Sequence, residues 1–223
     1  MAGPPYALSL SEDTVSAGRR WALPAANRVL YVLTGDAAVA SGGGDARVAA
    51  DAAWHGRGAC EITAGAGGAT VLRWELLDGG MAPSAAAAAG VRTRVLLAHA
   101  LDLDPRALYL MRCDRVDFAP GGKALPHRHR GGGIRCLVAG SLDVTVGEAT
   151  SRTMRPGSAW FESGREPVLA VSSAEAPTSF IRVAVLPREI RGRTSIMYVD
   201  PADAARGRPR TYTVYVDEPI EIA

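Results

Sequence analysis

Short runs of apolar and β-branched residues recur along the chain, each bounded by glycine, proline, aspartate or serine. Clear examples lie at 29–40, 134–146, 166–173 and 179–186. Runs of this kind are typical of β-strands. The Thr-Gly-Asp and Ala-Gly-Ser steps inside the first two runs predict hairpin turns. The pattern therefore predicts an all-β protein of the sandwich or barrel type.

Two segments depart from this pattern. Residues 81–105 include an alanine-rich stretch in which Ser84 suits a helix cap and Pro105 would end the helix. The same stretch could equally be a loose linker. Residues 211–217 read as an alternating strand after a proline- and arginine-rich loop. We expect this tail to complete a sheet, in its own subunit or in a neighbour's.

The apolar runs occur twice in the same order. The tripeptide Ala-Leu-Pro stands before an apolar run in both copies, at 22–24 and at 124–126. Trp54 matches Trp160 and Arg73 matches Arg182, and all offsets lie between 102 and 109 residues. A chance match would not keep order and offset together. We therefore predict two copies of one unit, followed by a tail. The expected boundaries are 1–80, a segment at 81–105, 106–190, and 191–223.

Composition narrows the class of protein. The chain has 223 residues, 48% of them hydrophobic, which suffices for two small buried cores. Its 25 basic and 23 acidic residues leave a charge of +2, which gives no argument for nucleic acid or membrane binding. Three cysteines without Cys-x-x-Cys spacing predict neither a disulfide framework nor a zinc knuckle. With no signal peptide and no apolar run near ~20 residues, we expect a soluble cytoplasmic protein.

The candidate chemistry centres on ALPHRHRGGGIRCLVAG at 124–140. His127 and His129 are two residues apart, so on a strand they point to the same face. Imidazole is the commonest nitrogen ligand for transition metals, which makes this pair a sound half-site for a divalent ion. Taken alone, the pair could also be two solvated histidines on a loop.

The surrounding spacing resembles the first motif of the cupin superfamily. Gly121, His127, His129 and Gly140 stand at the intervals of that motif, whereas Gly133 occupies the position of its glutamate. The segment RPGSAWFESGREPV at 155–168 resembles the second motif, with a matching glycine but with Pro167 at the position of its histidine. Two of the usual four metal ligands therefore match.

Because the unit occurs twice, nearly the whole chain resembles a bicupin. The resemblance implies two antiparallel, jelly-roll-like β-barrels in tandem, joined by a short helical or linker segment. The first copy has Ala25 and Asn27 at the histidine positions, so only the second copy carries the His-x-His pair. The resemblance also implies a divalent metal inside that barrel, of a kind such as iron, manganese, nickel or zinc.

A third metal ligand has to come from elsewhere, and Glu162 is the first candidate because it interrupts an otherwise apolar strand. The alternative is a glutamate that faces solvent at a strand end. Arg135 shares the parity of the two histidines, which suits an anionic substrate; the alternatives are an ion pair with Glu162 and an outward-facing edge residue. Gly133 leaves room for a substrate, and Trp160 is a candidate contact, although its match with Trp54 favours a packing role.

The leading functional hypothesis is a metal-dependent bicupin enzyme of the dioxygenase, isomerase or cyclase type. It would act on a small anionic organic substrate, with His127, His129 and Glu162 as metal ligands and Glu162 and Arg135 as catalytic residues. One alternative is a non-catalytic small-molecule-binding cupin that serves as a sensor or carrier. Another is a metal-free enzyme in which His127 or His129 is the acid or base. A homodimer is the expected assembly.

Overall fold

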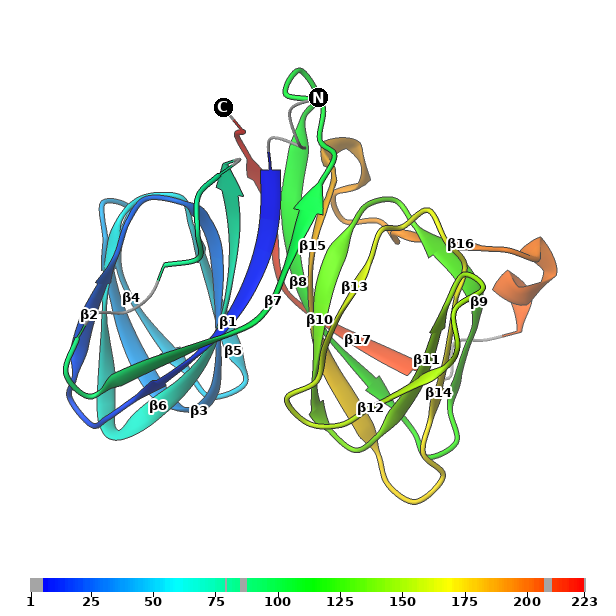
Figure 1. The fold of residues 1–223 in the computed structure, drawn as a ribbon, viewed down its shortest axis with the longest axis horizontal. Coiled ribbons are helices and arrows are strands. Elements are labelled where there is room, and N and C mark those ends of the chain that lie inside the picture. Colours follow the sequence, from blue (N-terminus) through cyan, green and yellow to red (C-terminus); the bar gives the residue numbers. More distant parts are fainter. Residues whose placement is uncertain (1–5, 79, 85–87, 207–209, 223) are drawn as a thin grey trace. The chain divides into compact units, whose positions relative to one another are not determined.

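We describe a computed structural model of the chain, which defines residues 6–78, 80–84, 88–206 and 210–222. The chain divides into two compact units, and Figure 1 shows their strands in sequence colours. The N-terminal unit runs up to Arg106 and includes Ile222, and the C-terminal unit is Ala107–Glu221. The described elements are seventeen β-strands and two short 3-10 helices, so the predicted all-β class is confirmed.

The strands of the N-terminal unit form a seven-stranded antiparallel sheet. Its path is β4-β3-β6-β1-β7, with β2 added to β6 and β5 added to β3. The long strands β3 and β6 change register twice and so bend around a core that includes Trp21, Leu30 and Ile62. The bounds are β1 Tyr6–Val15, β2 Arg20–Leu23, β3 Asn27–Ser41, β4 Gly44–Ala49, β5 Ala52–Gly56, β6 Cys60–Asp78 and β7 Val91–Leu101.

The prediction for 81–105 needs a correction. Instead of a helix or a free linker, this segment supplies β7, which pairs with β1 from Tyr6↔Leu101 to Val15↔Val91. The unpaired edge of β1 offers backbone hydrogen-bond partners along its whole length, and this tertiary pairing outweighs the local helical tendency. Residues 85–87 of the alanine-rich stretch lie outside the described residues.

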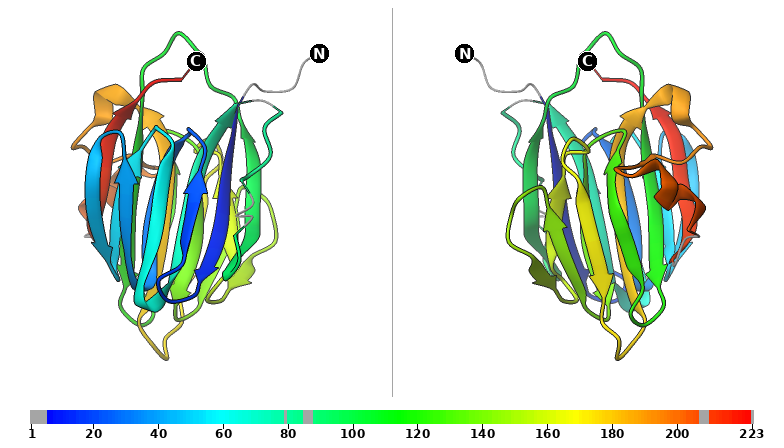
Figure 2. Two further views of the ribbon diagram at one scale, coloured as in Figure 1. Left: turned by 90° about the vertical axis from the view of Figure 1, so that its left-hand side faces the viewer. Right: turned by 90° about the vertical axis from the view of Figure 1, so that its right-hand side faces the viewer.

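The C-terminal unit contains two five-stranded antiparallel sheets, in the orders β13-β10-β15-β8-β17 and β12-β11-β14-β9-β16. Figure 2 shows these strands in its right-hand view. The bounds are β8 Tyr109–Phe118, β9 Lys123–His129, β10 Gly133–Ala139, β11 Leu142–Val146, β12 Arg152–Met154, β13 Ala159–Glu162, β14 Val168–Ser172, β15 Thr178–Pro187, η1 Arg188–Ile190, β16 Ile196–Tyr198, η2 Pro201–Ala205 and β17 Arg210–Ile220.

The tail forms β17, which pairs along the full length of β8 within the C-terminal unit. Apolar side chains from both sheets form the core of this unit, among them Leu137 and Trp160 from the first sheet and Leu142 and Val168 from the second. The edge strands β16 and β17 belong to different sheets. The predicted homodimer stays a prediction.

Strand register supports the internal repeat residue by residue. Leu30 on β3 pairs with Arg73 on β6 and with Trp54 on β5. Arg135 on β10 pairs in the same way with Arg182 on β15 and with Trp160 on β13. The two pairs matched by sequence, Trp54 with Trp160 and Arg73 with Arg182, therefore occupy equivalent places in the two units.

The repeated glycine at the end of each apolar run has a conformational cause. Gly35 and Gly140 adopt φ angles of +77° and +74°, a left-handed conformation that disfavours other residues. A Cβ on Gly140 would lie 2.4 Å from Thr178 Oγ1, and one on Gly35 would lie 2.0 Å from Gly68 O. Both conditions require glycine at the irregular point within β3 and at the turn that follows β10.

Candidate functional site

The two histidines share one face of β9 and are buried, with exposed fractions of 5% for His127 and 7% for His129. Their rings meet edge to face, with 4.9 Å between centroids. The strand lies between β14 and β16, so the histidines are part of the sheet and not of a solvated loop. They line a small interior cavity of about 20 Å³, which has room for roughly one water molecule.

A backbone contact orients His127. Its Nδ1 lies 2.7 Å from Leu125 O, and because a carbonyl only accepts, Nδ1 carries the proton and Nε2 is left as an acceptor. Burial, followed by the charge of Arg210, lowers the pKa of His127 to about 4. His127 is therefore a neutral, buried base at neutral pH.

Glu162 reaches the histidines from the neighbouring strand. It pairs with Gly133 across β10 and β13, so a carboxylate stands next to the position where the cupin motif has its glutamate. Oε1 accepts a hydrogen bond of 2.9 Å from Trp160 Nε1, and Oε2 lies 2.7 Å from Arg135 Nη2. With an exposed fraction of 5%, Glu162 does not face solvent.

The Arg135–Glu162 contact is a buried ion pair. Arg135 Nη2 and Glu162 Oε2 are close, but the angles are not those of a hydrogen bond. Burial by itself would raise the pKa of Glu162, yet the charge of Arg135 together with the contacts from His129 and Trp160 outweighs burial and holds that pKa well below its usual range. Burial lowers the pKa of Arg135 to about 10 against the opposing effect of Glu162, so both groups are ionised at neutral pH.

His129 lies between two charged partners. Its Nδ1 faces Arg182 Nη1 at 3.5 Å, and its Nε2 lies 3.1 Å from Glu162 Oε2. Because a guanidinium only donates, this arrangement favours the tautomer with its proton on Nε2, toward the carboxylate. Burial lowers the pKa of His129 to about 3, more than Glu162 raises it, so this contact involves a neutral imidazole.

Two predicted substrate contacts have packing roles in the structure. Trp160 lines the cavity, but its ring packs edge to face on Phe180, with 5.3 Å between centroids. Gly133 is not among the residues that line the cavity, and a Cβ there would lie 2.5 Å from Val183 O. The glycine is therefore needed for the close approach of β10 to β15. Substrate contact at either residue stays a prediction.

Sequence reasoning missed Arg210, the first residue of β17. Its exposed fraction is 6%, and its guanidinium carbon lies 6.0 Å from the Phe118 ring centroid and 5.7 Å from that of Tyr212. Nε donates to Tyr212 Oη. In the described part of the chain, Nη1 and Nη2 have no hydrogen-bond partner. The tail pattern indicated a strand, but nothing in the sequence indicated that this strand reaches the histidine cavity.

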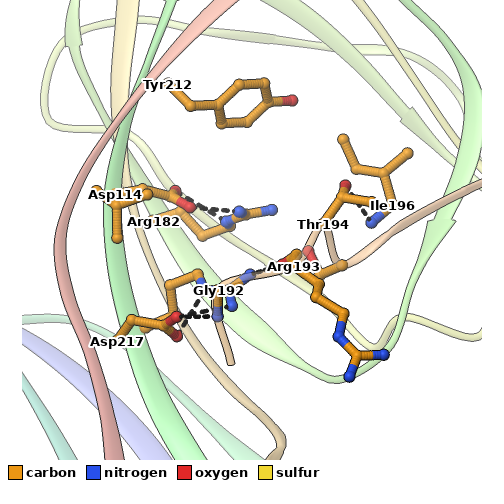
Figure 3. Close-up of a pocket in the computed structure, with 11 residues that line it drawn as sticks. Asp114, Arg182, Gly192, Arg193, Thr194, Ile196, Tyr212 and Asp217 are labelled. Carbon is orange, nitrogen blue, oxygen red and sulfur yellow. Dashed lines mark hydrogen bonds and ion pairs between the residues drawn. The ribbon is translucent and has the colours of Figure 1, made fainter. Parts of the chain in front are cut away.

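Sequence reasoning also missed the pair formed by Arg182 and Asp114. Arg182 Nε donates to Asp114 Oδ1 at 3.0 Å, and its Nη2 donates to Oδ2. Arg182 and Tyr212 line the histidine cavity and also a second, outer pocket of about 310 Å³. Figure 3 shows Tyr212 and the Arg182–Asp114 pair opposite Thr194 and Ile196 in this outer pocket.

Comparison with known proteins places this geometry in a known fold. No family model matches the sequence, and no curated protein matches it. A solved oxalate decarboxylase from Lactobacillus farciminis, in complex with formate, is similar at a TM-score of 0.62 and 10% identity, over 94% of this chain and 91% of that one. A mutant oxalate decarboxylase from Bacillus subtilis gives 0.61 and 13%, over 89% and 76%. AerE from Microcystis aeruginosa gives 0.58 and 10%, over 81% and 87%.

The chain has the bicupin fold. The resemblance of its sequence motifs, the division into two units and the antiparallel strand order within each unit agree on this point. At these identities the likeness concerns the fold and says nothing of substrate or reaction. Among the described residues, no helix is long and apolar enough to cross a membrane.

The N-terminal unit of this bicupin has a different buried network at the equivalent place. Glu75 accepts from Arg28 Nη2 at 2.8 Å and from Arg73 Nη1, and Asp13 accepts from Arg73 Nε at 2.7 Å. All four side chains are fully buried. These four side chains satisfy one another's charges. The candidate site of the chain is therefore the histidine cavity of the C-terminal unit.

The predicted metal ligands of the bicupin do not fit a divalent cation in this arrangement. His129 directs the protonated Nε2 at Glu162, and Arg135 engages the same carboxylate oxygen. The guanidiniums of Arg135 and Arg182 would both repel a dication. Within the described ranges, no group of three or more His, Cys, Asp and Glu side chains is arranged to hold a metal ion. Metal binding by His127, His129 and Glu162 stays a prediction.

Proposed function

We propose that the C-terminal unit catalyses metal-independent proton transfer on a small organic anion, with His127 as the general base. The observation that carries this proposal is the orientation of His127. Its Nδ1 is held by Leu125 O, which leaves Nε2 as a proton acceptor inside a buried cavity. A base with a fixed tautomer in a protected cavity is what proton abstraction requires.

The charges around the histidines support an anionic substrate. Three buried guanidiniums line the cavity, whereas only two buried carboxylates pair with them. The side chains concerned are Arg135, Arg182 and Arg210, with Glu162 and Asp114 as counter-charges. Because both histidines are neutral, one positive charge is left uncompensated. A substrate anion would supply the missing charge.

In this proposal Glu162 and Arg135 position the site. Glu162 holds Trp160, Arg135 and His129 around one carboxylate, and thereby fixes part of the wall of the cavity that His127 also lines. The excess positive charge would stabilise the negative charge that develops when a carbon next to a carbonyl loses its proton. His127 Nε2 takes that proton and returns it to a neighbouring carbon or to the same one.

The test is hydrogen exchange in D2O. The protein is incubated with a series of 2-oxo carboxylates, and loss of the proton next to the carbonyl is followed by NMR. We expect exchange with the wild-type protein, no change after chelator treatment, and a loss of about 100-fold or more in His127→Gln. The exposed His99 provides the matched control, because His99→Gln leaves the cavity intact. Exchange that is equal in wild type and His127→Gln would refute the proposal.

The second candidate is the metal-dependent enzyme predicted from the sequence motif. It is favoured by one observation, the convergence of the His127 ring, the His129 ring and the Glu162 carboxylate on one cavity. Elemental analysis of untagged protein, beside the His127→Ala/His129→Ala double variant, distinguishes the two candidates. Near one equivalent of metal, lost in the variant, would favour the metal-dependent enzyme.

A further inference from the structure

Arg210 is a buried cation that forms no ion pair with the residues that the structure describes. Its exposed fraction is 6%, and the described residues offer no partner to Nη1 or Nη2. The faces of Phe118 and Tyr212 at 6.0 and 5.7 Å compensate its charge only in part. Removing a guanidinium from water without pairing it is costly, because the lost hydration is not replaced.

Three other buried arginines of the chain provide a comparison. Arg28 in the N-terminal unit directs its nitrogens at Glu75, Pro24 O, Gly58 O and Cys60. Arg112 and Arg182 each form a two-contact pair with an aspartate. Of these four arginines, Arg210 lines a cavity with two terminal nitrogens to which the described part of the chain offers no hydrogen-bond partner.

We propose that Arg210 binds the carboxylate of the substrate through Nη1 and Nη2, and that the outer pocket between β16 and β17 holds an uncharged, apolar body of that substrate. The inference rests on the proposed function and adds its substrate class, an elongated monocarboxylate. Two parallel N–H groups of a guanidinium match the two oxygens of a carboxylate in geometry and charge.

The sizes of the two spaces assign the two ends of the ligand. The inner cavity of about 20 Å³ accepts only a small group, whereas the outer pocket of about 310 Å³ is in the range of pockets that bind organic ligands. Tyr212 and Arg182 line both spaces, so a ligand whose carboxylate lies at Arg210 would pass these two side chains.

The chemistry of the outer pocket favours an uncharged body. Its charged side chains are largely paired, Arg112 with Asp217 and Arg182 with Asp114, so they leave little capacity for a second anionic group. Arg193 is exposed, and in Figure 3 its guanidinium points away from Tyr212. The remaining walls include the apolar side chains of Ile196 and Val214 and the ring of Tyr212.

The probes are hexanoate, its neutral amide hexanamide, and acetate, with binding measured by ligand-detected NMR on the full chain. We expect hexanoate to bind the wild-type protein more tightly than acetate does, and hexanamide not to bind. Arg210→Met should weaken hexanoate binding by about 30-fold or more, as expected for loss of one partner of a buried charge pair. Arg115, which pairs with Asp117 and does not line either space, gives the control Arg115→Met, with unchanged binding.

A second readout separates ligand binding from a structural role. Because the described residues offer no partner to Nη1 or Nη2 of Arg210, Arg210→Met should raise the melting temperature by about 2 °C or more while it weakens hexanoate binding. A structural arginine would lower the melting temperature instead. Unchanged hexanoate affinity in Arg210→Met, or no hexanoate binding to the wild type, would overturn the inference. If the inference fails in this way but the protein still exchanges the proton of 2-oxo carboxylates, the proposed function stands. If hexanoate binds but no exchange occurs, the proposed function is refuted and the binding inference stands.

Discussion

At the scale of single residues, the site depends on which buried side chains form ion pairs and hydrogen bonds with one another. Glu162 carries out three tasks with one carboxylate, because it accepts from Trp160, neutralises Arg135 and faces His129. Replacing Glu162 alone by a neutral residue leaves the buried charge of Arg135 without its partner. The pairing of Arg135 with Glu162 is one of the interpretations that the sequence left open.

Glu162→Gln tests this dependence. Glutamine keeps the size and an acceptor for Trp160, but it leaves Arg135 as an unpaired buried charge. We expect a loss of about 3 kcal/mol in the free energy of unfolding, measured by urea denaturation. The double variant Arg135→Met/Glu162→Gln should recover most of this loss, since it removes both charges. A double variant as unstable as the single one would show that the ion pair is not the cause.

At the scale of elements, glycines decide where the strands turn and how closely they approach. The chain leaves β10 at Gly140 in a left-handed conformation and enters β11 two residues later. The same turn occurs at Gly35 within β3 of the N-terminal unit. An apolar run followed by glycine is therefore a structural unit in both copies, which explains why the pattern recurs in the sequence.

Gly140→Ala should destabilise the C-terminal unit by about 2 kcal/mol. The added Cβ meets Thr178 Oγ1 at 2.4 Å and also disfavours the required φ of +74°. Gly42→Ala is the matched control, because no heavy atom lies within 4 Å of a Cβ built there and no positive φ is needed. Thermal unfolding of both variants checks the prediction, and equal melting temperatures would contradict it.

At the scale of the whole molecule, the buried titratable groups tie stability to pH. His127 and His129 have folded pKa values of about 4 and about 3, below the ordinary value of 6.5, and the pKa of Glu162 is also lowered. As the pH falls from 6.5 toward 4, the unfolded chain binds protons that the folded chain does not. The stability that these groups contribute is therefore fully present above about pH 6.5 and is lost as the pH falls through this window.

Urea unfolding at pH 7 and pH 4.5 measures this effect. We expect the wild-type protein to lose more stability than His127→Gln over the same interval, by about 2 kcal/mol, since the variant lacks one of the groups that titrate. The exposed His99 serves as the control, and His99→Gln should lose as much stability as the wild type. An equal loss in all three proteins would show that His127 does not titrate in this way.

The sequence by itself determined the features that depend on neighbours along the chain. Alternation and turn residues indicated the strands, the two copies and the tail, and the i, i+2 spacing placed His127 and His129 on one face. Parity also aligned Arg135 with them. Each of these follows from local geometry, because side chains two residues apart on a strand point the same way.

Only the tertiary structure decided the features that depend on which strands become neighbours. It made a strand of Val91–Leu101 by pairing it with β1, brought Arg210 from the end of the chain to the histidine cavity, and paired Arg182 with Asp114. These contacts join residues far apart in sequence, and their energies come from burial and pairing between elements. No periodicity along one segment contains that information, because the partner lies on another strand.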